Sequence, residues 1–266
     1  MNVGKNIRIE RIIDRKTKRT IIIPLDHGLT LGTIKGLEDL ASMVEKVALG
    51  GANAVLMHSG MVEAGHRRYG KDIGLIVHLS GATNLGPHPD RKVLVCSVET
   101  AVKMGADAVS IHLNIGADEE PQMLQDAQKV IQTAREWGMP LLAMMYPRGQ
   151  KITNENDPEV VNIAVRVGAE LGADIVKTNY TGDIDSFKYI VESVPIPVLI
   201  AGGPKMDTVV DLLQVAYESV QAGGIGVAFG RNVFQSDDPT KLVSALTKII
   251  HQNYTVEEVI KEYKFK

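Results

Sequence analysis

The stretch Gly172-Ala173-Asp174-Ile175-Val176-Lys177 decides the fold, because its pattern occurs three times along the chain. Residues 51–55 and 105–109 repeat it, and each copy places a glycine before a short apolar run. Glycine is suited to ending a helix, and β-branched residues are suited to a buried strand. The recurrence therefore predicts a chain built from repeated helix-to-strand units.

Further apolar runs extend this pattern to eight strands. They lie at residues 20–25, 74–77, 140–145, 196–200 and 225–229. Helical spacing of apolar residues fills the intervals, at 37–48, 97–104, 124–137, 158–171, 184–191 and 208–220. Eight strands alternating with helices predict an α/β protein with a (β/α)8 TIM barrel fold, and they favour this barrel over a doubly wound sheet.

The whole chain, residues 1–266, fits one such domain, since α/β barrels typically have about 250 residues. Residues 1–19 form an N-terminal lead-in that closes one end of the barrel or serves as an interface arm. Residues 254–266 form a C-terminal helix, which the capping box Thr255-x-x-Glu258 begins. Residues 79–96 form a long third loop that has room for its own strand pair.

Composition excludes several classes of function. The 29 Lys and Arg against 32 Asp and Glu give a net charge of −3, which provides no general attraction for nucleic acid or an anionic membrane. The single cysteine, Cys96, rules out an intramolecular disulfide framework and a cysteine-rich zinc site. No apolar signal core begins the chain and no long apolar span follows, so a cytoplasmic protein is expected.

Lys177 is the candidate that needs most explanation, because it ends an apolar run. In a barrel, the carboxyl end of a strand belongs to the catalytic face. A lysine amine held neutral there is a nucleophile toward a carbonyl carbon. The structural alternative is a lysine whose ammonium reaches a carboxylate such as Asp174 or Asp183.

Other strand ends add groups that imine chemistry requires. Asp26 follows the first strand and Tyr146 the fifth, so a carboxylate and a phenol can serve Lys177 as acid and base. Their structural alternatives are a loop-capping aspartate and a core tyrosine with a satisfied hydroxyl. The glycine-rich ends of strands seven and eight, with Lys205 and Arg231, match the usual barrel phosphate site, and tight turns without a ligand are the alternative.

Four histidines lie near strand ends and raise the question of a metal site: His27, His58, His78 and His112. None forms a close His-x-His or His-Glu-x-x-His pair, which disfavours zinc. No metal is expected.

Five ordered motifs carry a resemblance that spans the chain: Pro24-Leu25-Asp26-His27-Gly28, Met145-Tyr146-Pro147-Arg148-Gly149, Val176-Lys177-Thr178, Ala201-Gly202-Gly203-Pro204-Lys205 and Gly230-Arg231-Asn232. The chain resembles the archaeal-type class I aldolases, which form a Schiff base. The resemblance implies that Lys177 forms the imine, Tyr146 donates a proton and Asp26 accepts one. It implies a substrate-binding set of Asp26, His27, Gly28, Leu29, Thr30, Tyr146, Pro147, Arg148, Lys177, Gly202, Gly203, Gly230 and Arg231.

Within this family, Met144 stands where the fructose-bisphosphate aldolase branch is expected to have tryptophan, which favours the transaldolase branch. That branch implies transfer of a three-carbon hydroxyacetone unit from a sugar phosphate, 6-deoxy-5-ketofructose 1-phosphate, to L-aspartate semialdehyde. The reaction lies on the archaeal route to 3-dehydroquinate and aromatic amino acids. The resemblance also implies no cofactor and a homo-oligomer, commonly a decamer. A class I fructose-bisphosphate aldolase and a non-enzymatic sugar-phosphate-binding barrel remain as alternatives.

Overall fold

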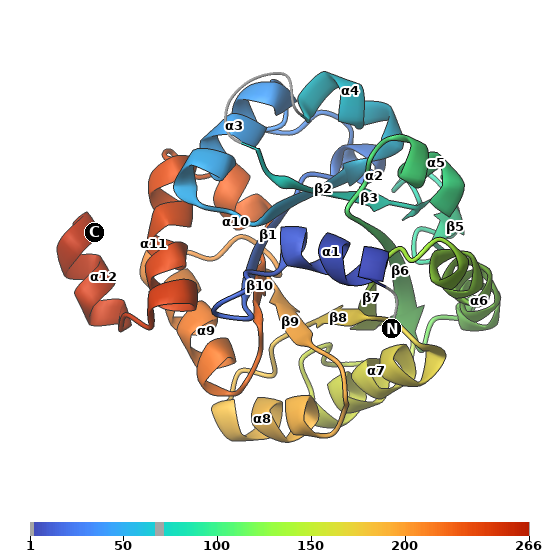
Figure 1. The fold of residues 1–266 in the computed structure, drawn as a ribbon. Helices are drawn as coiled ribbons and strands as arrows, with labels where there is room; N and C mark the ends of the chain where they lie inside the picture. Colours follow the sequence, from blue (N-terminus) through green and yellow to red (C-terminus); the bar gives the residue numbers. More distant parts are fainter. Residues whose placement is uncertain (1–2, 67–71, 266) are drawn as a thin grey trace.

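The computed structural model describes residues 3–66 and 72–265, which form a closed barrel of parallel strands ringed by helices (Figure 1). The strands follow the order β1-β10-β9-β8-β7-β6-β3-β2 around the barrel. Their bounds are β1 Thr20–Pro24, β2 Ala54–His58, β3 Gly74–His78, β6 Ala108–Ile115, β7 Leu141–Pro147, β8 Ile175–Thr178, β9 Val198–Ala201 and β10 Gly226–Ala228. Each overlaps a region predicted to be a strand, although strands such as β2, β6 and β7 extend beyond the predicted residues, and the prediction of a (β/α)8 barrel is confirmed.

The helices outside the barrel also follow the predicted spacing. The long ones are α3 Leu40–Gly50, α6 Glu120–Glu136, α7 Pro158–Leu171, α8 Ile184–Glu192, α9 Val209–Gln221 and α11 Pro239–Gln252, and shorter ones are α5 Val98–Lys103, α4 Val62–Gly65 and the 3-10 turn η1 Ser59–Met61. Gly51, Gly105 and Gly172 have φ of 101°, 77° and 102°. These left-handed values confirm the role that the repeated pattern assigns to glycine after each helix.

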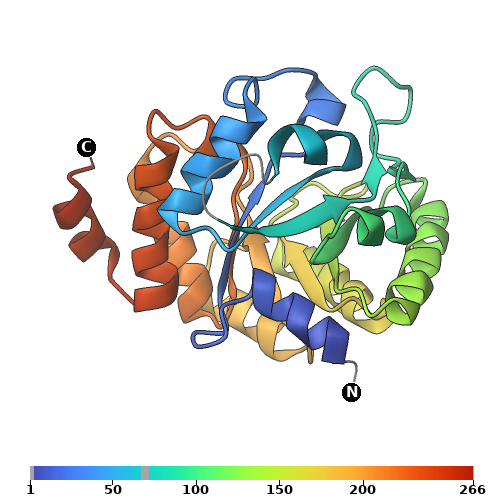
Figure 2. The same ribbon diagram turned by 45° about the horizontal axis from the view of Figure 1, so that its top comes forward.

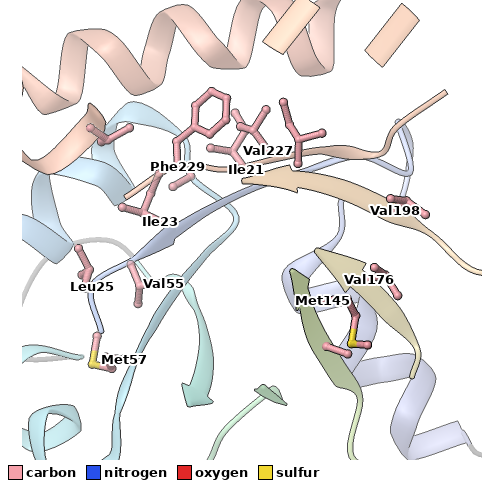
Figure 3. Packing of buried hydrophobic residues seen from close by; sticks show 14 of the residues in the cluster. Ile21, Ile23, Leu25, Val55, Met57, Met145, Val176, Val198, Val227 and Phe229 are labelled. Atoms are coloured by element: carbon pink, nitrogen blue, oxygen red, sulfur yellow. The ribbon is translucent and has the colours of Figure 1, made fainter. Parts of the chain in front are cut away.

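Side chains of each strand alternate between two apolar cores. Ile21, Ile23 and Leu25 point outward, and they pack with outward residues of the other strands beneath the helices (Figure 3). Ile22 lies between them in sequence and belongs to a second cluster inside the barrel. Because the side-chain period of a strand is two, this alternation fixes which residues beyond each strand end face the barrel axis.

The two ends of the barrel are closed differently. Helix α1, Val3–Ile12, crosses the end at which the strands begin, and its fully buried Ile12 joins the inner cluster. Figure 2 shows α1 on the opposite end of the barrel from the long loop after β3. That loop contains the antiparallel pair β4 Ser80–Gly81 and β5 Val93–Leu94, so the predicted strand pair is present.

The C-terminal helix α12, Val256–Tyr263, stands outside the helical ring beside α11 (Figure 1). The side chain of Thr255 accepts a hydrogen bond from the Glu258 amide, and Glu258 accepts one from the Thr255 amide, which is the predicted capping box. None of the helices described over residues 3–66 and 72–265 has the length and apolar character needed to cross a membrane.

Candidate active site

The carboxyl ends of the strands surround a cavity of about 800 Å³, which contains most of the predicted site residues. Strand alternation explains why they meet there. Ile175 of β8 and Leu142 of β7 face the barrel interior, so Lys177 and Tyr146 face it too. The same count from Ile22 on β1 brings Asp26, two residues beyond that strand, into the same cavity.

Lys177 is buried, with 6% of its surface exposed. β7 and β8 pair so that Met144 lies opposite Lys177, and the Lys177 Nζ is 4.0 Å from the Met144 Sδ and 6.0 Å from the Tyr146 ring centroid. Among the residues that the structure describes, no carboxylate oxygen lies within 4.0 Å of Lys177 Nζ. Within the described part of the chain, the amine therefore faces the cavity without a salt-bridge partner.

The two carboxylates offered as structural partners of Lys177 are engaged elsewhere. Asp174 pairs with Lys5 at 2.6 Å and accepts the Leu141 amide at 2.9 Å. Asp183 caps α8, accepting the Ser186 amide at 2.7 Å. Neither of these carboxylates is therefore the partner that the structural alternative assigned to Lys177.

Asp26 lies among histidines at the base of the cavity. Its Oδ2 is 3.9 Å from His78 Nε2, and its Oδ1 is 3.5 Å from His27 Nδ1. Burial raises the pKa of the Asp26 carboxyl, but positive charge on His78, His27, Lys177 and His58 outweighs burial and holds this pKa below its ordinary value. Asp26 is therefore a carboxylate at neutral pH and is able to accept a proton.

The histidines around Asp26 are kept neutral by burial. His78 is 4% exposed, and its Nδ1 is 2.7 Å from the Ser110 hydroxyl. Burial lowers the pKa of His78 to about 4, and it also lowers the pKa of His27 and His58. These rings are neutral near pH 7 and become positively charged only as the pH falls, and it is in that acidic range that their charge opposes protonation of Asp26.

Tyr146 lies between cationic and aromatic neighbours. Its ring contacts His112 edge to face, with centroids 4.9 Å apart, and the Arg148 guanidinium carbon is 5.6 Å from its centroid. Its hydroxyl makes no hydrogen bond within the described part of the chain, although the residue is only 9% exposed. The hydroxyl of a core tyrosine normally has a hydrogen-bond partner. The arrangement here therefore favours a Tyr146 hydroxyl that is available to bind a ligand.

The loops after β9 and β10 form a glycine-rich corner of the cavity. Gly203 has φ of 61°, and Arg231 donates a hydrogen bond to its carbonyl oxygen at 3.0 Å. A Cβ on Gly230 would lie 2.6 Å from His27 Cε1 and 3.0 Å from the Pro24 oxygen, so a side chain there is excluded. Gly202 lines the same corner and is buried.

Asn232 holds this corner together, a role that the sequence motif alone did not assign. It lies in the short helix α10, Arg231–Phe234, and its Nδ2 donates to the carbonyl oxygens of Gly202 and Pro204 at 3.0 and 3.1 Å. Its Oδ1 accepts the Met206 amide at 2.8 Å. One side chain thus fixes the loop that follows β9.

Three predicted binding residues lie beside the cavity rather than on its wall. Gly28 and Leu29 begin the short helix α2, Gly28–Leu31, and the Leu29 side chain packs against Gly81 of the third loop. Pro147 ends β7, buried next to Tyr146. His27, Thr30 and Arg148 do line the cavity.

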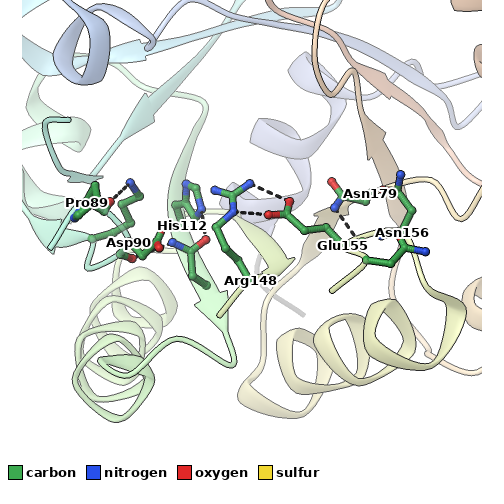
Figure 4. A network of polar contacts seen from close by, with 10 residues as sticks. Pro89, Asp90, His112, Arg148, Glu155, Asn156 and Asn179 are labelled. Atoms are coloured by element: carbon green, nitrogen blue, oxygen red, sulfur yellow. Dashed lines mark hydrogen bonds and ion pairs between the residues drawn. The ribbon is translucent and has the colours of Figure 1, made fainter. Parts of the chain in front are cut away.

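Polar residues on the cavity wall that were not predicted include Asp90, Lys92, Glu155 and Asn179. Figure 4 shows Asp90, Glu155 and Asn179 as part of a network of polar contacts. Asp90, Lys92 and Glu155 lie in the loops after β3 and β7, away from any strand end, so counting from strand ends does not find them. The charged run Asp90-Arg91-Lys92 inside an unusually long loop was the available signal.

The histidines do not assemble into a metal site. In the described ranges 3–66 and 72–265, no group of three or more His, Cys, Asp or Glu residues has a geometry that could hold a metal ion. His112, for example, is bonded through Nε2 to the Asn114 amide oxygen at 2.8 Å.

The chain is similar to known proteins along most of its length. Residues 20–236 match the family model of DeoC/LacD aldolases. A 2-amino-3,7-dideoxy-D-threo-hept-6-ulosonate synthase of Archaeoglobus fulgidus is 42% identical over 262 residues, which is 98% of this chain and 96% of that protein. A 2-amino-4,5-dihydroxy-6-oxo-7-(phosphonooxy)heptanoate synthase of Streptomyces griseus is 38% identical over 252 residues, 95% of this chain and 92% of the other.

Among solved structures, a Schiff-base-forming fructose-1,6-bisphosphate aldolase superposes with a TM-score of 0.85. The two proteins are 33% identical, and the match covers 93% of this chain and 100% of that one.

Proposed function

The chain belongs to the DeoC/LacD family of aldolases, and we propose that it is a 2-amino-3,7-dideoxy-D-threo-hept-6-ulosonate synthase acting through an imine on Lys177. Family membership and the Schiff-base-forming structural relative make it an enzyme of the aldolase or transaldolase type, which leaves a non-enzymatic sugar-phosphate binder without support. The observation that carries the proposal is the buried Lys177 amine, which faces the cavity beside Tyr146 with no salt-bridge partner among the described residues.

The donor in this proposal is 6-deoxy-5-ketofructose 1-phosphate. The Lys177 amine adds to the C5 ketone, and loss of water gives the imine. Asp26 takes the proton of the C3 hydroxyl, the C3–C4 bond breaks, and its electron pair moves into the protonated imine. Hydroxypyruvaldehyde phosphate leaves and a hydroxyacetone enamine remains on Lys177. The protonated imine serves as electron sink, so this step needs no metal.

The second half of the reaction joins the enamine to L-aspartate semialdehyde. The enamine carbon attacks the aldehyde carbon, and Tyr146 donates a proton to the alkoxide that forms. Water then hydrolyses the imine, which releases the seven-carbon product and restores the Lys177 amine. The glycine-rich corner with Arg231 supplies main-chain and charge-assisted donors for the donor's phosphate.

A direct assay separates the synthase from an aldolase that cleaves fructose 1,6-bisphosphate. Purified protein is given L-aspartate semialdehyde with the deoxy-ketosugar phosphate, and separately fructose 1,6-bisphosphate. We expect the seven-carbon amino acid from the first mixture to form much faster than triose phosphates from the second. Efficient cleavage of the bisphosphate with no transfer to the semialdehyde would refute the synthase and support the aldolase. Met144 stands where the aldolase branch is expected to have tryptophan, which favours the synthase and therefore faster formation of the seven-carbon amino acid.

A second candidate follows from the Streptomyces griseus relative, whose name places a phosphate on carbon 7 of a similar amino acid product. In that product, carbons 5 to 7 correspond to a dihydroxyacetone phosphate unit, so the nucleophile keeps its phosphate. The two candidates are distinguished by supplying dihydroxyacetone phosphate as donor and measuring whether the product mass includes the phosphate.

We also propose that the enzyme works in the cytoplasm, on the route to aromatic amino acids, as a homo-oligomer of ten chains. The resemblance to archaeal-type class I aldolases supports this assembly. Light scattering coupled to gel filtration measures the mass of the purified particle, and a monomer at working concentration would contradict it.

A further inference from the structure

The cavity has two charged sides of different character. On the side of β9 and β10 lies the glycine-rich corner. The charged wall residues that the structure describes there are both cations, Lys205 and Arg231. On the opposite side, the loops after β3 and β7 contribute two cations and two carboxylates, namely Lys92, Arg148, Asp90 and Glu155. The first side suits a dianion such as a phosphate, whereas the second has no net charge.

The side formed by Asp90, Lys92, Arg148 and Glu155 is called the mixed side, because it carries both signs of charge. Arg148 is held in a fixed orientation there. Its Nε and one terminal nitrogen donate to the two Glu155 oxygens at 2.8 and 3.0 Å, which fixes the plane of the guanidinium (Figure 4). The backbone oxygen of Glu155 accepts the Asn179 amide at 2.9 Å, so the loop that carries Glu155 is itself anchored. The remaining terminal nitrogen of Arg148 is not used by this pair.

Lys92 lies near Arg148 and keeps unused donors. Its Nζ donates to the Pro89 oxygen at 2.6 Å, and among the described residues it forms no ion pair with a carboxylate. Burial lowers the pKa of Lys92, the charge of Asp90 raises it, and the charge of Arg148 lowers it. Two neighbouring, partly desolvated cations repel each other, and a bound anion relieves that repulsion.

Asp90 adds a negative charge beside Lys92 and Arg148. Its backbone oxygen accepts the Asn114 amide at 2.7 Å, which fixes the residue in place. Its carboxylate accepts no hydrogen bond from the described part of the chain, although the residue is half-buried on the cavity wall. An anionic acceptor is therefore available beside two cations.

We propose that Asp90, Lys92 and Arg148 bind the α-amino acid end of the aldehyde acceptor, so that they determine which acceptor the enzyme uses. The acceptor's carboxylate lies on Lys92 and the free nitrogen of Arg148, and its ammonium lies on Asp90. Glu155 is a positioning residue that orients Arg148. This inference rests on the proposed transfer to an amino-acid aldehyde and adds the residues that recognise it.

Geometry places this subsite at a suitable distance from the reacting carbon. The Tyr146 ring centroid is 6.0 Å from Lys177 Nζ and 5.6 Å from the Arg148 guanidinium carbon, so the imine nitrogen and the mixed side lie beside the same aromatic ring. A four-carbon amino-acid aldehyde spans such a gap when its aldehyde meets the enamine. The donor's phosphate then has the glycine-rich corner on the other side of the cavity.

Charge complementarity favours this occupant over a second phosphate group. A phosphate dianion on the mixed side would face both Asp90 and Glu155, whereas a zwitterion places an opposite charge against each member of the set. The names of both curated relatives describe seven-carbon acids with a 2-amino group, which differ in the phosphate and share the amino-acid end.

The test compares two acceptors in the variants Lys92→Gln and Asp90→Asn of the intact enzyme. With L-aspartate semialdehyde, each change should raise KM for the acceptor roughly 10- to 100-fold, because a charge-assisted contact is lost. With propanal, which has neither an amino nor a carboxylate group, the variants should match the wild type. Borohydride trapping of the donor on Lys177 should be unchanged in both variants.

Controls separate recognition from folding. Lys103→Gln changes an exposed lysine on α5 and should leave both acceptors unaffected. Lys92→Arg keeps the charge and should recover part of the lost affinity. Variants that lose activity equally with both acceptors, or that keep the wild-type KM for the semialdehyde, would overturn this subsite while leaving the transfer reaction intact. A wild-type enzyme that forms the donor adduct but never uses the semialdehyde would overturn both proposals.

Discussion

The Lys177 amine lies next to the Met144 thioether and the Tyr146 ring, and no carboxylate oxygen of the described residues lies within 4.0 Å of it. A structural lysine in a protein interior normally has a charged partner, because an unpaired buried charge is costly. An amine that gives up its proton to form an imine avoids that cost during the reaction. The surroundings of Lys177 are therefore those of a nucleophile.

Tyr146 should affect proton transfer but not imine formation. Tyr146→Phe keeps the ring and its contacts with Lys177 and Arg148 while removing the hydroxyl. We expect turnover to fall roughly 10²- to 10⁴-fold, the usual effect of a positioned acid or base, while borohydride still traps the donor. Near-normal turnover would mean that the tyrosine only packs and that Asp26, His27 or water moves the proton.

His78 should make the fold sensitive to acid. Its pKa is about 4 in the folded protein against 6.5 when exposed, so between these values the unfolded chain binds a proton that the folded chain does not. Stability present above pH 6.5 is therefore lost as the pH falls toward 4, by about 2 kcal/mol between pH 7 and pH 5.

Denaturant unfolding of wild type and His78→Gln at pH 7 and pH 5 measures this contribution. The variant should lose about 2 kcal/mol less than the wild type over the same interval. A histidine remote from His78, such as His251, titrates alike in both proteins and cancels in the comparison. Equal losses in the two proteins would show that His78 is not held neutral.

At the scale of elements, β10 and the short helix α10 form one unit with the loop after β9. Arg231→Ala removes a cation and the hydrogen bond to Gly203. KM for the phosphate-bearing donor should rise roughly 10- to 100-fold, with a smaller effect on kcat, since the phosphate is remote from the bond that breaks. As a control, Arg166→Ala breaks an exposed pair with Glu170 and should change neither constant. An unchanged KM for Arg231→Ala would remove this corner from the site.

Helix α1 should matter for stability and not for chemistry. Ile12 is fully buried in the inner core at the end of the barrel opposite the cavity. Ile12→Ala should lower the free energy of unfolding by about 2–5 kcal/mol, the range for large-to-small changes in a core. Chemical denaturation measures the loss, and kcat at a temperature where the variant is folded should equal the wild-type value. A large loss of kcat would show that α1 communicates with the site.

The strand pattern explains how much of the site could be foreseen. Alternation along β1, β7 and β8 brings Asp26, Tyr146 and Lys177 into one cavity, and this follows from apolar spacing alone. Glu155 and Lys92 could not be found in this way, because loop geometry places them. Helix α1 was missed as a helix because its residues are mostly polar, and α6 begins at Glu120 rather than at the predicted 124 for the same reason.

At the scale of the whole molecule, the barrel separates stability from chemistry. α1 and the inner apolar cluster close one end, while the other end opens into a cavity in which the strands present their polar residues. One side of that cavity suits a phosphate and the other a zwitterion, with the amine between them. The proposed transfer between a sugar phosphate and an amino-acid aldehyde uses these groups in the order in which they lie around the barrel.

The central claim is that the reaction passes through an imine on Lys177, and peptide mapping by mass spectrometry after borohydride reduction tests it most directly. With the donor present, the peptide containing Lys177 should gain the mass of the reduced three-carbon unit or of the whole donor, Lys177→Ala should gain none, and EDTA should leave activity intact. An unmodified Lys177 peptide, together with activity that is lost in chelator and restored by a divalent metal, would contradict the account.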